Sequence, residues 1–175
     1  MSIITNNASG KVNFDEISCS QIEIKGKCKG KSLSAKNISF LGDFKVDSVK
    51  VEKSFKVSCR INVKNLDAEN IIIESNESTI EKINCADIKI FNNDTSDDDN
   101  IFSKIFGGGN FQSKSNSRVK IKNISSDKVE LENCAVEEIK CTDAFIKSNC
   151  VIKKLTVKNI CDVAADSKVG EIIRG

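Results

Sequence analysis

The chain has 175 residues, of which 39% are apolar and 30% charged, and its formal net charge is +2. This length predicts one domain with a sizeable core, and the near balance of charge argues against a nucleic-acid-binding surface. The chain has no histidine, which excludes every catalytic arrangement and every zinc site that needs an imidazole.

The apolar residues are biased toward β-branched side chains, with 24 isoleucines and 13 valines against five leucines. β-branched side chains are restricted at χ1 and suit the pleated surface of a sheet, whereas a helical protein would use more leucine and alanine. The chain is therefore predicted to be all-β.

Residues 1–9 are predicted to be an N-terminal tail, and residues 10–91 contain five copies of one template about 16 residues long. Each copy consists of three apolar-x-apolar pairs. The first copy has its pairs at Val12 and Phe14, Ile17 and Cys19, and Ile22 and Ile24. Each pair fits a short strand with two side chains pointing inward and one pointing outward.

The repeat continues at residues 119–175, which hold copies six to eight and part of a ninth. Across eight full copies, 44 of the 48 template positions are apolar, whereas composition alone would give about 19. Three short strands per turn, stacked in parallel on the next turn, form a solenoid. The fold prediction is a single parallel β-helix of triangular cross-section with one inserted loop.

Residues 92–118 interrupt the repeat and are predicted to be that inserted loop. Ile101, Phe102, Ile105 and Phe106 have the spacing of one apolar helix face, which Gly107–Gly109 would end, and Phe111 follows. Two interpretations stay open. The segment folds back on the rod near three apolar residues predicted to face outward, or it binds a protein or membrane partner. The three outward residues are Ile72, Phe145 and Val151.

The two ends of the predicted rod are the candidate self-assembly sites. An uncovered end of a solenoid exposes unpaired strand backbone and a cross-section of core, to which another copy can add. The predicted end residues are Val12, Phe14 and Ile17 in the first turn and Val169, Ile172 and Ile173 in the last. Asp162 occupies a predicted inward position and is interpreted as the place where the regular core opens toward its end.

The eight cysteines include no C-x-x-C pair, and they predict neither a metal site nor a disulfide framework. Six fall at inward positions, where a free cysteine acts as a small hydrophobe. Cys59 and Cys161 lie outside the inward register and are predicted to be the more reactive thiols. The stretch Gly26–Ser32 has one residue too few between its glycines for a phosphate-binding loop, so no cofactor is predicted. The six inward cysteines are Cys19, Cys28, Cys85, Cys134, Cys141 and Cys150.

This repeat resembles the bactofilins, the polymer-forming cytoskeletal proteins of bacteria, in their longer two-part form found in Gram-positive species. The resemblance is carried by GKVNFDEISCSQIEI at Gly10–Ile24, by its recurrence after Gly26 and Gly42, and by the stretch from Val119 (VKIKNISSDKVELENCAVEEIKC) to Val169. It implies a right-handed β-helix that polymerises without nucleotide into filaments supporting cell shape or protein localisation.

Two functions from different classes are therefore expected. The first is a non-enzymatic cytoskeletal scaffold that assembles end to end with copies of itself. The alternative is a monomeric or dimeric β-helical binding module that presents residues 92–118 to a protein or membrane partner. An enzyme is disfavoured, because histidine is absent and no cluster of carboxylates forms on one outward face. With no signal peptide and no apolar run of membrane-spanning length, the expected location is the cytoplasm, and contact with the inner face of the membrane stays open.

Overall fold

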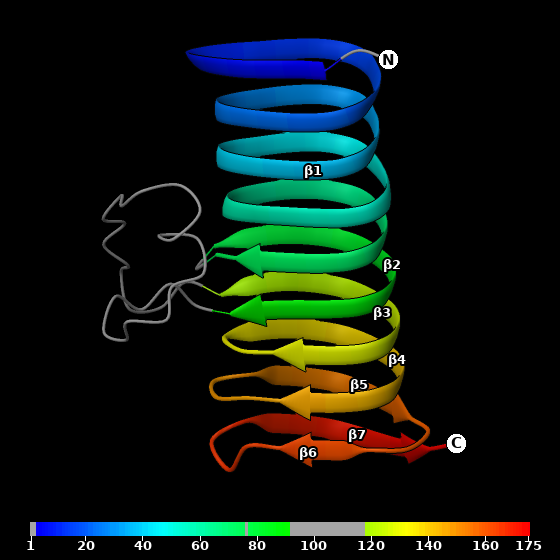
Figure 1. The fold of residues 1–175 in the computed structure, drawn as a ribbon. Coiled ribbons are helices and arrows are strands. Elements are labelled where there is room, and N and C mark those ends of the chain that lie inside the picture. The colour runs from blue at the N-terminus through cyan, green and yellow to red at the C-terminus, as the bar shows by residue number, and fades with distance from the viewer. Residues whose placement is uncertain (1–2, 76, 92–117) are drawn as a thin grey trace, which may run out of the picture.

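The computed structural model describes residues 3–75, 77–91 and 118–175, with side chains from residue 11 onward. The chain winds in stacked coils around one axis, and the first and last described residues lie at opposite ends of a rod (Figure 1). The predicted parallel β-helix is confirmed, and the described part of the chain contains no helix. Its strands are β1 (Ile3–Glu74), β2 (Ser78–Phe91), β3 (Val119–Leu131), β4 (Cys134–Ile146), β5 (Val151–Val157), β6 (Cys161–Val163) and β7 (Lys168–Arg174).

All strand pairs are parallel, and the order of the sheet follows the chain as β1-β2-β3-β4-β5-β7, with β6 paired to β4. Successive turns are 15 to 17 residues apart: Asn62 pairs with Thr79, Val119 with Cys134, and Ala135 with Val151. β1 contains several coils within one continuous strand and begins at Ile3, so extended backbone starts before the first predicted turn.

The solenoid stacks directly across the inserted segment. Ser78 at the start of β2 pairs with Val119 at the start of β3, and the register continues to Ile90 with Leu131. Residues 92–117 lie outside the described residues. The two turns that flank the insertion therefore contact each other as closely as turns that follow directly in sequence.

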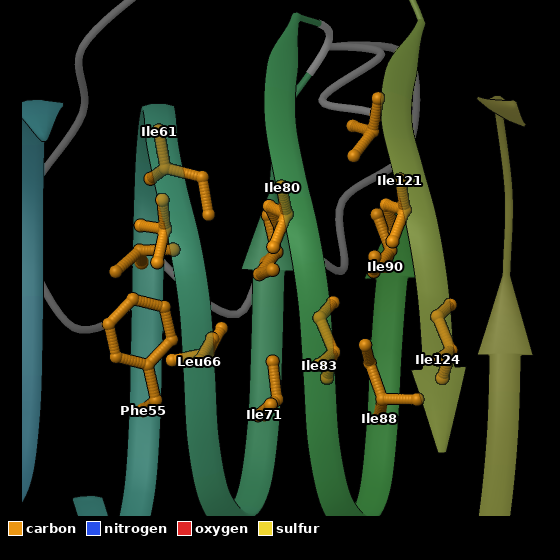
Figure 2. Close-up of a cluster of buried hydrophobic side chains, with 14 of the residues drawn as sticks. Phe55, Ile61, Leu66, Ile71, Ile80, Ile83, Ile88, Ile90, Ile121 and Ile124 are labelled. Carbon is orange, nitrogen blue, oxygen red and sulfur yellow. The ribbon is translucent and has the colours of Figure 1, made fainter. Parts of the chain in front are cut away.

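The core consists of rows of inward side chains that run along the rod, one residue per turn. One row passes through Leu66, Ile83, Ile124, Ile139 and Leu155, and each of these side chains is at most 2% exposed. Figure 2 shows how isoleucines of adjacent coils point into the same interior. Because each coil covers the next, burial of a row member depends on the turns on both sides of it.

The polar or small residues at predicted inward positions have specific contacts. Ser78 is buried, and its hydroxyl oxygen accepts a hydrogen bond of 2.9 Å from the backbone N–H of Ile61. Ser126 donates to the carbonyl oxygen of Ala86 at 2.7 Å. At Gly30 the Phe14 ring takes the space of a side chain, since a Cβ there would lie 2.2 Å from the ring. These positions keep the register although they are not apolar.

The prediction that Ile160 and Asp162 face inward is wrong by one residue. Ile160 is 44% exposed and Asp162 is exposed, whereas Cys161 and Val163 are partly buried and packed against the core. Cys161 pairs with Ala144, and Val163 pairs with Ile146, so β6 continues the inward rows. The preceding corner is longer than the template allows, because Asp143 accepts hydrogen bonds from the backbone N–H of Ile160 and the side chain of Asn159.

One corner of the rod is closed by small residues. Gly26 and Gly42 have φ of 135° and 136°, which favours glycine. A Cβ at Gly42 would lie 1.9 Å from the carbonyl oxygen of Gly26. Cys59 follows at this corner, buried at 8% exposure, and its sulfur is hydrogen-bonded to the backbone of Gly42. The prediction that Cys59 lies outside the core is therefore wrong, because the close stacking of this corner encloses it.

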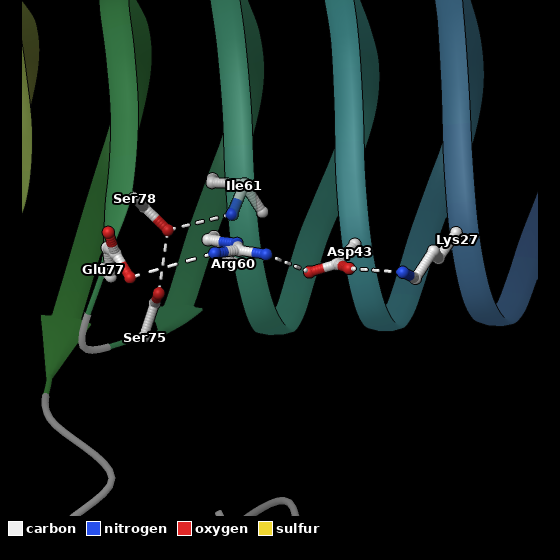
Figure 3. Close-up of polar contacts among 7 residues, drawn as sticks. All are labelled: Lys27, Asp43, Arg60, Ile61, Ser75, Glu77 and Ser78. Carbon is white, nitrogen blue, oxygen red and sulfur yellow. Dashed lines mark hydrogen bonds and ion pairs between the residues drawn. The ribbon is translucent and has the colours of Figure 1, made fainter. Parts of the chain in front are cut away.

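Charged side chains also form rows, on the outside of the rod. Beside the glycine corner, Asp43 contacts Lys27 at 3.7 Å and Arg60 at 3.3 Å, and Arg60 contacts Glu77 at 3.9 Å (Figure 3). The charges in this row alternate in sign from turn to turn. In the same view, Ser75 and Ser78 are hydrogen-bonded at 2.7 Å and close the corner from the inside.

A second row, which we call the charge ladder, alternates without exception over eight turns. Its members pair two by two as Asp15–Lys31, Asp47–Lys64, Glu81–Lys122 and Glu137–Lys153, at 3.0 to 3.2 Å between nitrogen and oxygen. The sequence analysis did not find this ladder. The signal was opposite charges spaced by one turn at the same place in every template copy.

Candidate self-assembly ends

The C-terminal end of the rod is a layer made of β6 and β7. β7 pairs with β5 on one side and is the last strand in the order of the described sheet, while β6 pairs with β4 alone. Lys168 donates its backbone N–H to Cys150 at 2.9 Å, and Gly175 donates to Val157 at 3.2 Å, which fixes β7 on the preceding turn. The other edge of β7 offers backbone N–H and C=O groups in the direction of the rod axis.

The inward rows are open at this end. Val169 pairs with Ile152 and is partly buried against the core, as predicted for an end residue. Ile172 pairs with Leu155, which is fully buried, yet Ile172 itself is 47% exposed. The difference arises because no described strand covers Ile172 from the outer side. An apolar core position is therefore left in contact with solvent.

The third predicted C-terminal end residue has a different place. Ile173 pairs with Thr156, outside the inward rows, and is half-buried. Arg174 instead continues the inward row after the fully buried Val157 and is exposed. The sequence analysis missed Arg174, although its distance of one turn from Val157 was a usable signal. The final layer thus combines an exposed isoleucine with a guanidinium group.

The N-terminal end is less open at the predicted residues. Phe14 and Ile17 are half-buried and packed against the core, and Val12 is also half-buried. β1 starts at Ile3, so strand backbone precedes these residues, and the side chains before residue 11 lie outside the description. The three predicted residues belong to the first described layer of side chains, with the Phe14 ring seated over Gly30.

The predicted partner-binding residues Ile101, Phe102, Ile105, Phe106 and Phe111 lie outside the described residues. The three apolar residues suggested as docking points are described. Ile72 and Phe145 are half-buried members of one outward row, separated by Lys89 and Glu130. Val151 is 36% exposed and stacks between Ala135 and Lys168 in another row. Lys128 places its ammonium group 5.4 Å from the centre of the Phe145 ring. These three residues therefore do not form one continuous apolar patch.

The cysteines are free thiols, and most are enclosed by the core. Burial raises the pKa of Cys28, Cys85 and Cys141 to about 11. The pKa of Cys59 is also raised, first by burial, which opposes the predicted reactivity because the thiolate is the nucleophile. Cys161 is half-buried against the core, so its predicted place outside the inward register is also wrong.

The remaining motifs carry no recognisable chemistry in the structure. Within the described residues, no group of three or more cysteine and carboxylate side chains is placed to hold a metal ion. The phosphate-loop-like stretch Gly26–Ser32 is part of β1, and its Cys28 points into the core. No helix in the described part of the chain has the length and hydrophobicity of a membrane span.

Comparison with known proteins adds no name to this fold. No family model matches the chain, and no match was found among curated proteins or among solved structures. The class of protein is therefore defined by the structure itself: a parallel β-solenoid with an uncovered layer at its C-terminal end.

Proposed function

We propose that this protein is a non-enzymatic scaffold that assembles end to end, without nucleotide, into filaments that support cell shape or protein localisation. The observation that carries the proposal is Ile172, a core-row residue that is 47% exposed at the end of the rod. The unpaired edge of β7 beside it offers hydrogen-bonding groups in the direction in which the rod would grow. A second copy seated there would bury Ile172 and extend the sheet.

The shape of the molecule supports the same proposal. The first and last described residues lie at opposite ends of the rod, so an end-to-end contact continues the axis and does not close a ring (Figure 1). The sequence resemblance to bactofilins agrees with this arrangement. In this proposal the partner of the chain is itself, and the filament is a homopolymer.

Electron microscopy of the purified protein, with sedimentation to follow the polymer, tests the proposal. We expect Ile172→Glu to abolish filaments, because it places a carboxylate in the apolar contact. Val151→Glu is the matched control, since Val151 is also exposed, at 36%, but lies on the side of the rod one turn earlier. Circular dichroism establishes that both variants keep their strand content. Monomeric wild-type rods at high concentration would refute end-to-end assembly.

A second candidate function is supported by the direct pairing of β2 with β3. Because these strands stack in register, residues 92–117 are not required to connect the two parts of the solenoid. The chain could thus be a binding module that presents this segment to a protein or membrane partner. Replacing residues 92–117 by a short Gly-Ser linker distinguishes the candidates: the scaffold proposal expects filaments to persist, whereas the binding module expects loss of the partner with unchanged assembly state.

A further inference from the structure

Cys134 and Cys150 lie next to each other in one inward row near the C-terminal end. Cys134 begins β4 and Cys150 directly precedes β5, and the adjacent residues Ala135 and Val151 are paired in register. Both thiols are free, and the two residues are at most 1% exposed. Neighbouring strands are about 4.8 Å apart, which is within the Cα separation of about 4.4–6.8 Å that a disulfide spans.

The two sulfurs are in contact and differ in character. The Cys134 thiol is hydrogen-bonded to Cys150, and it also donates to the carbonyl oxygen of Glu132 at 3.1 Å. This bond from Cys134 lowers the pKa of Cys150 against the effect of its burial, and the Ser167 hydroxyl adds to it. Burial raises the pKa of Cys134 well above its ordinary value. Cys150 is therefore the better nucleophile of the pair, and Cys134 is placed to resolve it.

No other described cysteines are neighbours within one row. Cys28 pairs along its row with Phe44, an offset of one turn, and Cys161 pairs with Ala144. Cys85 and Cys141 share a row but are separated by Ser126, to which the Cys85 thiol donates at 3.4 Å. A direct bond between thiols of adjacent turns is thus geometrically open to one pair within the described residues.

Only one thin layer separates this pair from the end of the rod. The backbone N–H of Cys150 donates to the Ser167 hydroxyl at 2.9 Å, and its carbonyl oxygen accepts from Lys168 at 2.9 Å. Both contacts come from the start of β7 and the residue before it. Transient opening of the last turn, which has a neighbour on one side only, would uncover Cys150 to a small oxidant.

We propose that Cys134 and Cys150 form a redox-active dithiol that a peroxide converts to an intrachain disulfide joining β4 to β5. The Cys150 thiolate attacks one peroxide oxygen, breaking the O–O bond and giving a sulfenic acid; with the proton from the Cys150 thiol, the departing hydroxide becomes water. The Cys134 sulfur then attacks the sulfenic sulfur, and its proton leaves with the hydroxyl group as a second water. The pair loses two electrons, and the peroxide is reduced to two water molecules. This inference does not depend on the assembly proposed above.

Peptide mapping of the full chain after treatment with hydrogen peroxide tests the proposal. Remaining thiols are alkylated under denaturing conditions before trypsin digestion. Cys134 then lies alone in peptide 129–140 (VELENCAVEEIK), and Cys150 lies alone in peptide 148–153 (SNCVIK). We expect these two peptides to appear as one cross-linked species, about 2 Da lighter than their sum, and to separate after reduction. The urea midpoint of the oxidised protein should be higher, because the bond constrains the unfolded chain.

Variants identify the pair. Cys134→Ser and Cys150→Ser should each abolish the cross-link, and the double variant Cys28→Ser, Cys141→Ser should keep it, since it removes two other core thiols. Two results would overturn the proposal: no cross-linked peptide at a peroxide level that oxidises other cysteines of the folded wild-type protein, or a cross-link that forms only after the chain is unfolded in urea. Both are read from the wild-type protein, so they hold even if a serine variant fails to fold.

Discussion

The middle of the rod and its C-terminal end present the same row of side chains in two environments. Ile83 in the middle is fully buried, and Ile172 at the end of the same row is 47% exposed. The residue type is the same and each is paired in a parallel sheet, so the difference comes from the neighbouring turn alone. In this fold a turn does not bury its own core, and each layer depends on the next one for its stability.

The largest expected effect comes from shortening the buried member of this row. Ile83→Ala should lower the free energy of unfolding by about 2–5 kcal/mol, because it removes buried methyl groups and leaves a cavity. Ile172→Ala should cost less than about 1 kcal/mol, since its side chain is already half in solvent. Urea unfolding under conditions where both proteins are monomeric measures the two values. Equal losses would contradict the dependence of burial on the neighbouring turn.

A second comparison of middle and end concerns the glycines. Gly42→Ala should destabilise the protein by about 1–3 kcal/mol, because its φ is 136° and the new Cβ would lie 1.9 Å from the carbonyl oxygen of Gly26. Gly175→Ala at the end is the control, where the nearest atom to a Cβ is 3.9 Å away. Thermal unfolding should separate the two variants. A neutral Gly42→Ala would show that the corner relaxes easily.

The core thiols extend the comparison to pH. The pKa of Cys28 and of Cys141 is raised to about 11 by burial, above the value of 9.0 for a free thiol. The folded state therefore holds these protons more tightly, and stability should be constant below about pH 9 and fall as pH rises toward about 11. Urea midpoints measured across this range test the direction. The double variant Cys28→Ala, Cys141→Ala should show a shallower fall.

The smallest expected effect concerns the exposed charge ladder. Lys122→Glu places three carboxylates in line with Glu81 and Glu137 and should cost roughly 0.5–1 kcal/mol at low salt, with most of the loss removed by high salt. Lys153→Glu should cost less, because its neighbour in the last turn is Gly170. Urea unfolding at two salt concentrations measures both. A loss that salt does not reduce would point to packing as its cause.

The sequence predicted the rows of the core because inward and outward residues alternate in every template copy. Even the irregular third turn is placed correctly, since Phe55 and Val57 are fully buried. The errors lie at corners, where hydrogen bonds and close backbone contacts decide the residue count. Cys59 is enclosed through Gly42, and Asp143 holds a longer corner that turns Cys161 inward. Neither contact is visible in a pattern of apolar residues.

The candidate ends were predicted less well than the fold. Val169 and Ile172 follow from the period of the template, and both continue inward rows. Ile173 was chosen for its hydrophobicity, yet the register places Arg174 in the row instead. Exposure at an end also depends on which strand is outermost, and that is a property of the whole stack. A local sequence window therefore cannot supply it.

The alternation of the charge ladder gives the rod a parity. A shift of the stack by one turn would place Asp beside Asp and Lys beside Lys, whereas a shift by two turns would restore every opposite pair. The insertion between Glu81 and Lys122 respects this rule, because the turns on its two sides still carry opposite charges. A rod of this kind that grew by internal duplication would keep its ladder only by adding turns in pairs.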